Sequence, residues 1–289
     1  MLDTLINIAD FFTLEGLIKI IFQTDLFTTI TDTLSINLFS SSGKFGSVLS
    51  LIRSLYDIIF PVAVMMLFIY FMISLIERCS NDTFTWEQLW KVFAMLVATK
   101  ILIEHGFDLL ERLFEIGLAI TDSFAAIRGA GSEFALGEEQ IADIVKDLNE
   151  NMGWVMKFIR NILLWIALLI PALISFIMRI AVSVICYSRI AEIYVRAVFT
   201  PIALSDVFHG GLQSSGWRYL KSFMAICLQG ATIIVIAIIY GQLMSALLQN
   251  YAQDGSFWAF YSISIAVQAS AIALMFKSLN LTREIMGVA

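Results

Sequence analysis

Long stretches of this chain contain no charged side chain. Ser222 to Gln253 has no Asp, Glu, Lys or Arg, and Gly255 to Phe276 follows directly after the single Asp254. Crossing the hydrocarbon layer of a bilayer takes about 20 mostly apolar helical residues, whereas apolar runs of about 10–14 are more typical of helices buried in soluble proteins. The two runs therefore predict spanning helices, and with them an all-α, polytopic membrane protein.

Three earlier segments extend this pattern. The first predicted span is Ile58 to Ile76, with Pro61 near its start, where a helix tolerates proline in its first turn. A second is expected to begin near Trp90. The third, Asn161 to Phe199, would extend about 58 Å as one helix, nearly twice the hydrocarbon thickness. Its far end is therefore expected to stand outside the membrane.

The second span carries charges within its helical pattern. Lys100 precedes Glu104 by four residues, so the two side chains can pair on one face, and His105 and Asp108 follow. Charged side chains at membrane depth face protein or water. The same pattern also fits a helix end that leaves the bilayer with a solvated face, so both interpretations stay open.

The spans divide the chain into five regions. Apolar residues at helical spacing among acids at the N-terminus suggest a helix at a membrane surface, and the centre holds two further amphipathic stripes. The predicted regions are 1–50, amphipathic and interfacial; 51–110, two spans; 111–153, an acidic extramembrane helical region; 154–204, the long span; and 205–289, an inner connection, two spans and the tail.

The distribution of Lys and Arg predicts the orientation. Short basic connections stay on the cytoplasmic side of a membrane, which places the C-terminus inside and, with five spans, the N-terminus and the acidic centre outside. A six-span alternative divides the long helix near Arg179 and moves both of these regions to the cytoplasm. The basic residues of the short connections are Arg78, Lys91, Arg218, Lys221, Lys277 and Arg283.

Composition agrees with a membrane protein and narrows its chemistry. Hydrophobic residues make up 59% of the chain and charged residues 15%, with a mean hydropathy of +0.85. The net charge of −6 disfavours a surface that coats nucleic acid. The three cysteines are far apart, and neither a phosphate-binding glycine loop nor a zinc-type His/Glu spacing occurs. We therefore expect no catalytic residue, metal or cofactor, and no enzyme.

One segment of the long helix is rich in charged side chains. Arg189, Glu192 and Arg196 share a helical face, and Glu192 can pair with either arginine. The remaining positive charge is then available to a partner carboxylate or a lipid phosphate. Pro201 is expected to end or kink the helix. These residues either pin a helix at the inner headgroup layer or form a hinge that contacts another subunit.

Three amides lie within the last two predicted spans. Gln229, Gln242 and Gln268 are candidates for hydrogen bonds between helices, the commoner role of such side chains in membranes. The alternative is that they line a pore.

The segment Tyr187 to Leu204, followed by Trp217 to Lys221 and by Gln229-Gly230, resembles the TrbL family of conjugation proteins. The resemblance continues in shorter motifs earlier in the chain and covers most of residues 48–288, most like the short forms of Gram-positive conjugative elements. These earlier motifs are Ile52 to Leu55, Ile59 to Val62, Trp90-Lys91 and Phe107-Asp108.

The TrbL resemblance implies an integral subunit of a type IV secretion channel in the cytoplasmic membrane, with an outward N-terminus and an inward C-terminus. Its implied partners are secretion ATPases, the coupling protein and other channel subunits, with DNA as cargo and the chain as a homo-oligomer in membrane lipid. A permease subunit driven by a separate ATPase is the alternative, and a structural membrane anchor is a third possibility.

Overall fold

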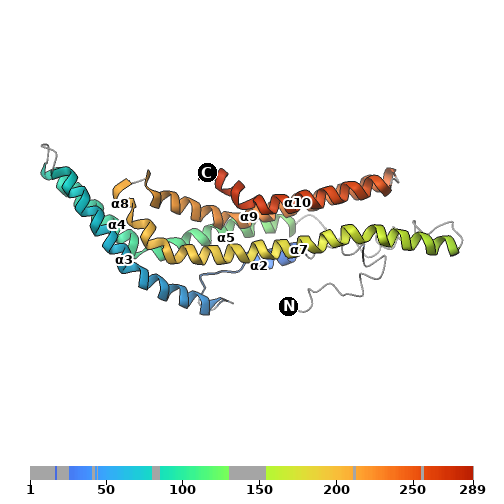
Figure 1. Cartoon of the computed structure of the whole chain (residues 1–289), viewed down its shortest axis with the longest axis horizontal. Helices are drawn as coiled ribbons and strands as arrows, with labels where there is room; N and C mark the ends of the chain where they lie inside the picture. The colour runs from blue at the N-terminus through green and yellow to red at the C-terminus, as the bar shows by residue number, and fades with distance from the viewer. Residues whose placement is uncertain are drawn as a thin grey trace. The chain divides into compact units, whose positions relative to one another are not determined.

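The computed structural model of the chain describes residues 17, 26–40, 43, 45–79, 85–129, 154–210, 213–254 and 257–288. Throughout these residues the regular elements are helices, which confirms the all-α prediction (Figure 1). Apart from Leu17, the predicted N-terminal amphipathic helix lies outside the described residues, as does the second of the two amphipathic stripes predicted in the centre of the chain. The helices are α2 Leu26–Leu34, α3 Gly46–Cys79, α4 Trp86–Glu104, α5 Gly106–Gly129, α7 Trp154–Ser205, α8 Val207–Gly210, α9 Ser215–Asp254 and α10 Phe257–Ile285.

Four of these helices are long and apolar enough to cross a membrane. Within the described residues the candidate spans are Gly46–Cys79, Leu168–His209, Ser215–Met244 and Ser262–Ile285. Helix α4, where a span was expected to begin near Trp90, is not among them, because its nineteen residues include Glu87, Lys91, Lys100 and Glu104. The polytopic membrane fold is therefore confirmed, while the five-span count and the orientation stay predictions.

Helix α3 begins earlier than the predicted first span. It runs from Gly46 to Cys79, so Pro61 lies in the interior of the helix. The expectation that Pro61 lies in the first turn is therefore wrong. The added N-terminal part is helical because Leu49, Ile52 and Tyr56 recur at helical spacing and are buried. This packing holds the helix together across a proline that removes one internal hydrogen bond.

Helix α7 is continuous from Trp154 to Ser205. The alternative in which two spans are separated by a turn near Arg179 is therefore wrong. Pro201 was expected to end or kink the helix, and the structure has the kink, because α7 continues for one more turn to Ser205. Figure 1 shows α7 bending in these last turns before α8. A proline inside a helix produces such a bend, since its ring clashes with the carbonyl four residues earlier.

The chain divides into two compact units, each with its own core. The first unit contains Met1–Leu34, Asp122–Cys186 and Thr232–Ser278. The second unit contains Ser35–Thr121, Tyr187–Ala231 and Leu279–Ala289. Helices α5, α7, α9 and α10 each contribute residues to both units. Leu168, Met178 and Ile233 belong to the buried core of the first unit.

Aromatic side chains fill one part of the second unit's core. The ring centroid of Phe107 lies 5.5 Å from that of Phe39 and 5.5 Å from that of Tyr56, in edge-to-face contacts. The Tyr56 hydroxyl donates to the carbonyl oxygen of Ile103, at 2.8 Å, where α4 ends. A Cβ at Gly106 would lie 2.8 Å from this hydroxyl, so glycine lets α5 begin beside α3.

Helices α5 and α9 touch through backbone in the second unit. A Cβ added at Gly117 would lie 2.8 Å from both the Cβ and the carbonyl oxygen of Cys227. Small residues allow this close approach between helices in membranes. The beginning of the predicted acidic central region therefore packs against a candidate span, and Leu110 and Phe114 of α5 are buried in the same core.

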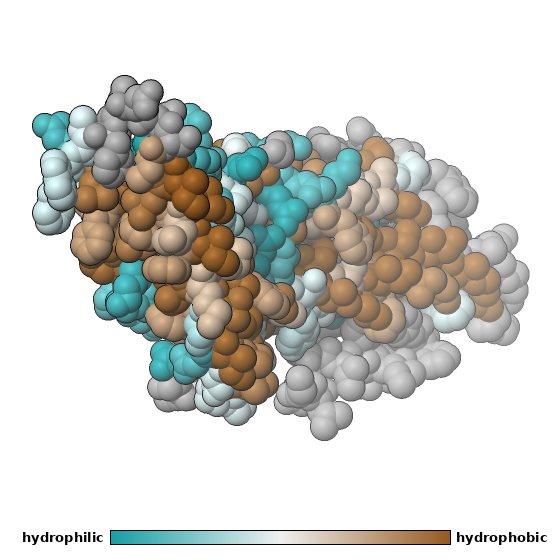
Figure 2. All heavy atoms as spheres, turned by 60° about the vertical axis from the view of Figure 1, so that its left-hand side comes forward, coloured by the Kyte–Doolittle hydropathy of each residue, from teal (hydrophilic) through white to brown (hydrophobic). Residues whose placement is uncertain are grey.

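Large apolar side chains also cover broad areas of the surface. Figure 2 shows these hydrophobic spheres, with smaller groups of hydrophilic ones between them. Helix α3 carries many of them, and Ile58, Met65 and Ile76 are each 65–69% exposed. Contiguous apolar surface of this extent is typical of a protein that faces lipid or other membrane subunits.

Candidate functional site

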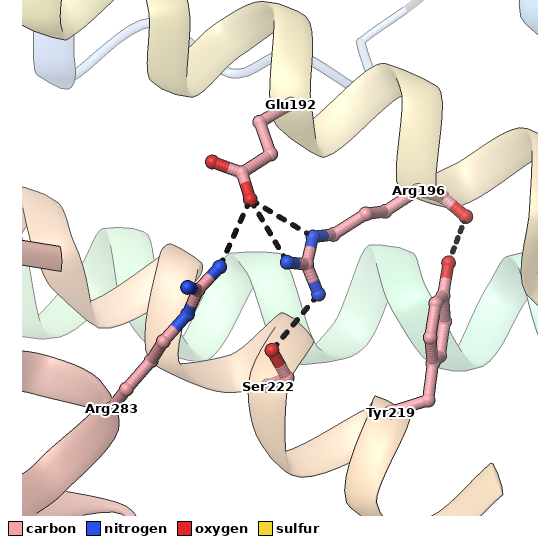
Figure 3. Close-up of polar contacts among 5 residues, drawn as sticks. All are labelled: Glu192, Arg196, Tyr219, Ser222 and Arg283. Atoms are coloured by element: carbon pink, nitrogen blue, oxygen red, sulfur yellow. Dashed lines mark hydrogen bonds and ion pairs between the residues drawn. The ribbon is translucent and has the colours of Figure 1, made fainter. Parts of the chain in front are cut away.

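The sequence-predicted charged face of α7 lies where three helices of the second unit meet. The end of α7, the start of α9 and the end of α10 contribute its side chains (Figure 3). A short connection joins α7 to α9: Asp206 accepts hydrogen bonds from the backbone N–H of Ser215, at 2.9 Å, and from its hydroxyl. Ser214 caps α9 by accepting from the Trp217 N–H at 3.2 Å.

Glu192 is the centre of the cluster. Its Oε1 accepts hydrogen bonds from Nη2 and Nε of Arg196, at 2.9 and 3.2 Å, and from Nη2 of Arg283, at 3.3 Å. Arg196 also donates from Nη1 to the Ser222 hydroxyl at 2.9 Å. These contacts, drawn in Figure 3, connect α7 to both α9 and α10. We call Glu192, Arg196, Ser222 and Arg283 the arginine cluster.

The arginine cluster is partly open to its surroundings. The side chains of Arg196, Glu192 and Arg283 are 20%, 31% and 31% exposed. One carboxylate therefore receives two guanidinium groups in a half-buried setting, where ion pairs are screened less than at a fully exposed surface. The cluster keeps a surplus of one positive charge.

Arg189 points to a different partner from the one expected. Its Nε donates to the carbonyl oxygen of Ile226, at 3.0 Å, and its Nη2 to that of Cys227, at 2.9 Å. The residue is only 3% exposed. Backbone carbonyls in the first third of α9 thus accept from a buried guanidinium, which fixes one helix against the other through strong, charge-assisted hydrogen bonds.

Gly230 makes room for this guanidinium. A Cβ at position 230 would lie 2.8 Å from Nη1 of Arg189 and 3.0 Å from its Cζ. Any larger side chain would displace the arginine from the carbonyl oxygens on α9. Arg189 and Gly230 therefore act as a matched pair.

The bend of α7 has its own hydrogen bonds. Pro201 has no N–H, and the Thr200 hydroxyl donates to the carbonyl oxygen of Arg196, at 2.9 Å. The Tyr219 hydroxyl from α9 donates to the same carbonyl oxygen, as Figure 3 shows. The carbonyl oxygen that loses its helical donor at Pro201 is that of Ala197, four residues earlier. The two hydroxyls instead hold the neighbouring carbonyl of Arg196, and Tyr219 thereby connects the bend to α9.

The other predicted polar residues do not join the arginine cluster. Lys100 Nζ lies 3.3 Å from Glu104 Oε1, with side chains 57% and 42% exposed, so this pair is a solvent- or headgroup-facing one. In the first unit, the Gln268 amide donates to the Ser175 hydroxyl at 3.0 Å and connects α10 to α7. Gln229 is buried and Gln242 is exposed.

The described residues contain no group of three or more His, Cys, Asp or Glu side chains placed to hold a metal ion. Cys79 is exposed, while Cys186 and Cys227 are buried, and all three are free thiols. The arginine cluster itself offers donors and positive charge. Its chemistry suits the binding of carboxylates or phosphates and the fixing of helices.

Sequence reasoning missed several members of this region. Arg283 was assigned only to the basic tail, because nothing in a linear pattern places α10 beside α7. Ser222 and Tyr219 are common residue types, and their roles appear only once the helices are packed. Gly230 was noted within the Gln229-Gly230 pair, and a glycine inside an apolar helix was the available signal of a close approach.

Comparison with models of protein families shows to which family this chain belongs. The model of the TrbL/VirB6 plasmid conjugal transfer-like proteins matches residues 41–201, more than half of the chain. The chain belongs to this family. Among curated proteins and among solved structures, no match was found. This TrbL/VirB6-like chain is thus a multi-pass membrane protein of a conjugal transfer system, as the resemblance had predicted.

The matched segment contains part of the site. Arg189, Glu192, Arg196 and Pro201 lie inside residues 41–201, whereas Ser222 and Arg283 lie beyond them. The α7 side of the arginine cluster therefore belongs to the TrbL/VirB6-like part of the chain, and the α9 and α10 side lies outside the matched range.

Proposed function

We propose that the chain is a channel or scaffold subunit of a conjugative type IV secretion system and supports DNA and protein transfer across the cytoplasmic membrane. The observation that carries this proposal is the family match over residues 41–201, which covers α3, α4, α5 and most of α7. Its helices supply the wall of a conduit, or brace it. Energy for transfer then comes from other proteins of the system.

The proposed partners follow from this role. Secretion ATPases and the coupling protein act on the cytoplasmic side, other channel subunits contact the helices in the membrane, and DNA passes as cargo. The exposed apolar side chains of α3 support lateral contacts, because a homo-oligomer covers part of such a surface with neighbouring copies and lipid covers the remainder. The orientation in this proposal is N-terminus outside and C-terminus inside.

Within this role, Arg189, Glu192, Arg196 and Pro201 form the hinge at which subunit contacts act on the spans. Arg189 fixes α7 to α9, and the arginine cluster adds α10. A contact that shifts the end of α7 would therefore move three helices together. The bend at Pro201 lies one turn beyond Arg196 and directs the chain into the connection with α9.

The experiment that tests this role measures conjugation frequency from donors that express the Arg189→Ala, Arg196→Ala double variant. We expect the protein to be present in the membrane at its normal level and transfer to fall at least tenfold. Arg112→Ala is the matched control, because Arg112 is 79% exposed and pairs only locally with Glu115.

A single Arg196→Gln variant separates function from folding. It leaves Arg189 in its buried site, and we expect it to lower transfer while the membrane level of the protein stays normal. Normal transfer from both arginine variants, at normal protein levels, would remove this segment from the mechanism.

A further inference from the structure

Charge is distributed unevenly over this chain. The whole protein has a net charge of −6. In contrast, the segments of the second unit that follow Cys186, namely 187–231 and 279–289, hold five basic residues and three acidic ones. The basic residues are Arg189, Arg196, Arg218, Lys221 and Arg283, and the acidic ones are Glu192, Asp206 and Glu284.

The arginine cluster lies at the border of the charge-free helical stretches. Arg196 donates to Ser222, the first residue of the charge-free run in α9. Arg283 lies on α10 shortly after the other charge-free run ends at Phe276. A long apolar run ends where the hydrocarbon layer meets the headgroups, so the cluster lies at headgroup depth. Trp217 is partly exposed one turn before Ser222, as is common for tryptophan at this depth.

The arginine cluster has positive charge and a hydrogen-bond donor to spare. Two guanidinium groups share the single oxygen Oε1 of Glu192. Nε of Arg283 is buried and has no acceptor among the described residues. Because burying a charged donor without an acceptor is costly, an anionic group with several acceptor oxygens would stabilise this arrangement.

We propose that the arginine cluster binds the phosphate of an anionic phospholipid in the cytoplasmic leaflet. A phosphate diester presents a pair of non-bridging oxygens that can accept from both arms of a guanidinium fork, and it brings the negative charge that Glu192 alone does not supply. The exposed fractions of Arg196 and Arg283 leave a way in from the headgroup layer. Arg218 and Lys221 are exposed on the same end of α9 and favour an anionic lipid over a neutral one.

The test uses the purified full-length protein in neutral phosphatidylcholine nanodiscs and adds phosphatidylglycerol with the same acyl chains. We expect phosphatidylglycerol to bind and to raise the thermal unfolding midpoint, and extra phosphatidylcholine to do neither. Arg283→Gln should weaken this binding about fivefold, the effect of one basic residue near an anionic surface. Arg112→Gln, which removes an equal charge from an exposed local pair, should leave it unchanged.

The Glu192→Gln variant should change the affinity for phosphatidylglycerol in the opposite direction. It releases both guanidinium groups from their shared carboxylate, so phosphatidylglycerol should bind more tightly, by about fivefold. A merely structural role for Glu192 would give weaker binding or none, because the site would be distorted.

Three results would overturn the proposal. The first is equal phosphatidylglycerol binding by the wild-type protein and by both the Arg283→Gln and the Glu192→Gln variants, because binding would then take place elsewhere. The second is equal stabilisation by soluble glycerophosphate or inorganic phosphate at millimolar concentration, because the site would then take free phosphate and not a lipid. The third is that none of these anions binds, because the surplus charge would then be left to a protein carboxylate.

Discussion

Arg189 and Gly230 form a contact between α7 and α9 that composition alone does not reveal. Arg189 places a full positive charge against two backbone carbonyls of α9, and Gly230 leaves the space that the guanidinium occupies. The contact is possible because glycine brings the arginine within reach of the helix backbone. In a membrane protein such a buried charge is expensive unless its donors are satisfied, which these carbonyls achieve.

The Gly230→Ala variant tests this pair. The added Cβ would lie 2.8 Å from Nη1 of Arg189, so we expect the free energy of unfolding to fall by about 1–3 kcal/mol, as in other overpacked sites. In an Arg189→Ala background the same change should be neutral or stabilise by about 0.5–1 kcal/mol, since alanine favours a helix more than glycine does. Thermal unfolding in detergent micelles gives the four values of this double-mutant cycle.

An equal loss of stability from Gly230→Ala in both backgrounds would contradict the account. The glycine would then matter for some contact other than Arg189.

At the residue scale the sequence predicted part of the site. Helical spacing alone brings Glu192 and Arg196 together, and the two do pair. The same spacing offered Arg189 as a partner for Glu192, whereas the structure directs Arg189 to carbonyls of α9. Arg283 is ninety-one positions from Glu192. Only the tertiary arrangement of α7 and α10 determines that contact, so local pattern could not reveal it.

At the scale of elements, apolar runs predicted the helices more reliably than their ends. The charge-free runs of α9 and α10 gave these two helices directly. Pro61 was expected in the first turn of its helix, yet α3 begins fifteen residues earlier. Pro201 was expected to end or kink its helix, and α7 continues through it with a bend. Tertiary packing overrides the local cost of a proline, about 3 kcal/mol, when neighbouring side chains supply apolar contacts.

The continuity of α7 is directly measurable within the first unit. Val184 follows Ile166 by 18 positions on this helix, which corresponds to about 27 Å at 1.5 Å per residue. Both side chains are exposed and accept nitroxide labels after substitution by cysteine in a cysteine-free variant. Two helices folded back near Arg179 would bring the same positions within about 15 Å, given helix axes about 10 Å apart.

Pulsed electron paramagnetic resonance separates these two distances. We expect a main distance near 27 Å, and singly labelled variants identify any contribution from pairs of copies. A main distance near 15 Å that occurs in the doubly labelled protein and not in the singly labelled variants would show that α7 is divided into two helices, as in the six-span scheme.

For the whole molecule, hydropathy predicted a membrane protein, and the family match showed that it belongs to a conjugal transfer family. Four candidate spans and broad apolar surface make the chain a multi-pass membrane protein. The match over residues 41–201 makes it a member of a conjugal transfer family. Its orientation rests on the placement of Lys and Arg, and helix packing within each unit does not determine which end faces the cytoplasm.

The contacts at these three scales fit together. Apolar helices make the chain a multi-pass membrane protein, and Arg189 and the arginine cluster connect α7, α9 and α10. In the proposed transfer role these connections form a hinge, and we propose mechanical coupling and lipid binding as the roles of the charged residues of α7.

The measurement that tests the central claim most directly is conjugation frequency from donors in which the gene for this chain has been deleted in frame. We predict that transfer falls by several orders of magnitude and returns when the full chain is supplied separately, with donor growth unchanged. Undiminished transfer from the deletion donor would contradict the account and would favour a separate membrane role, such as a permease.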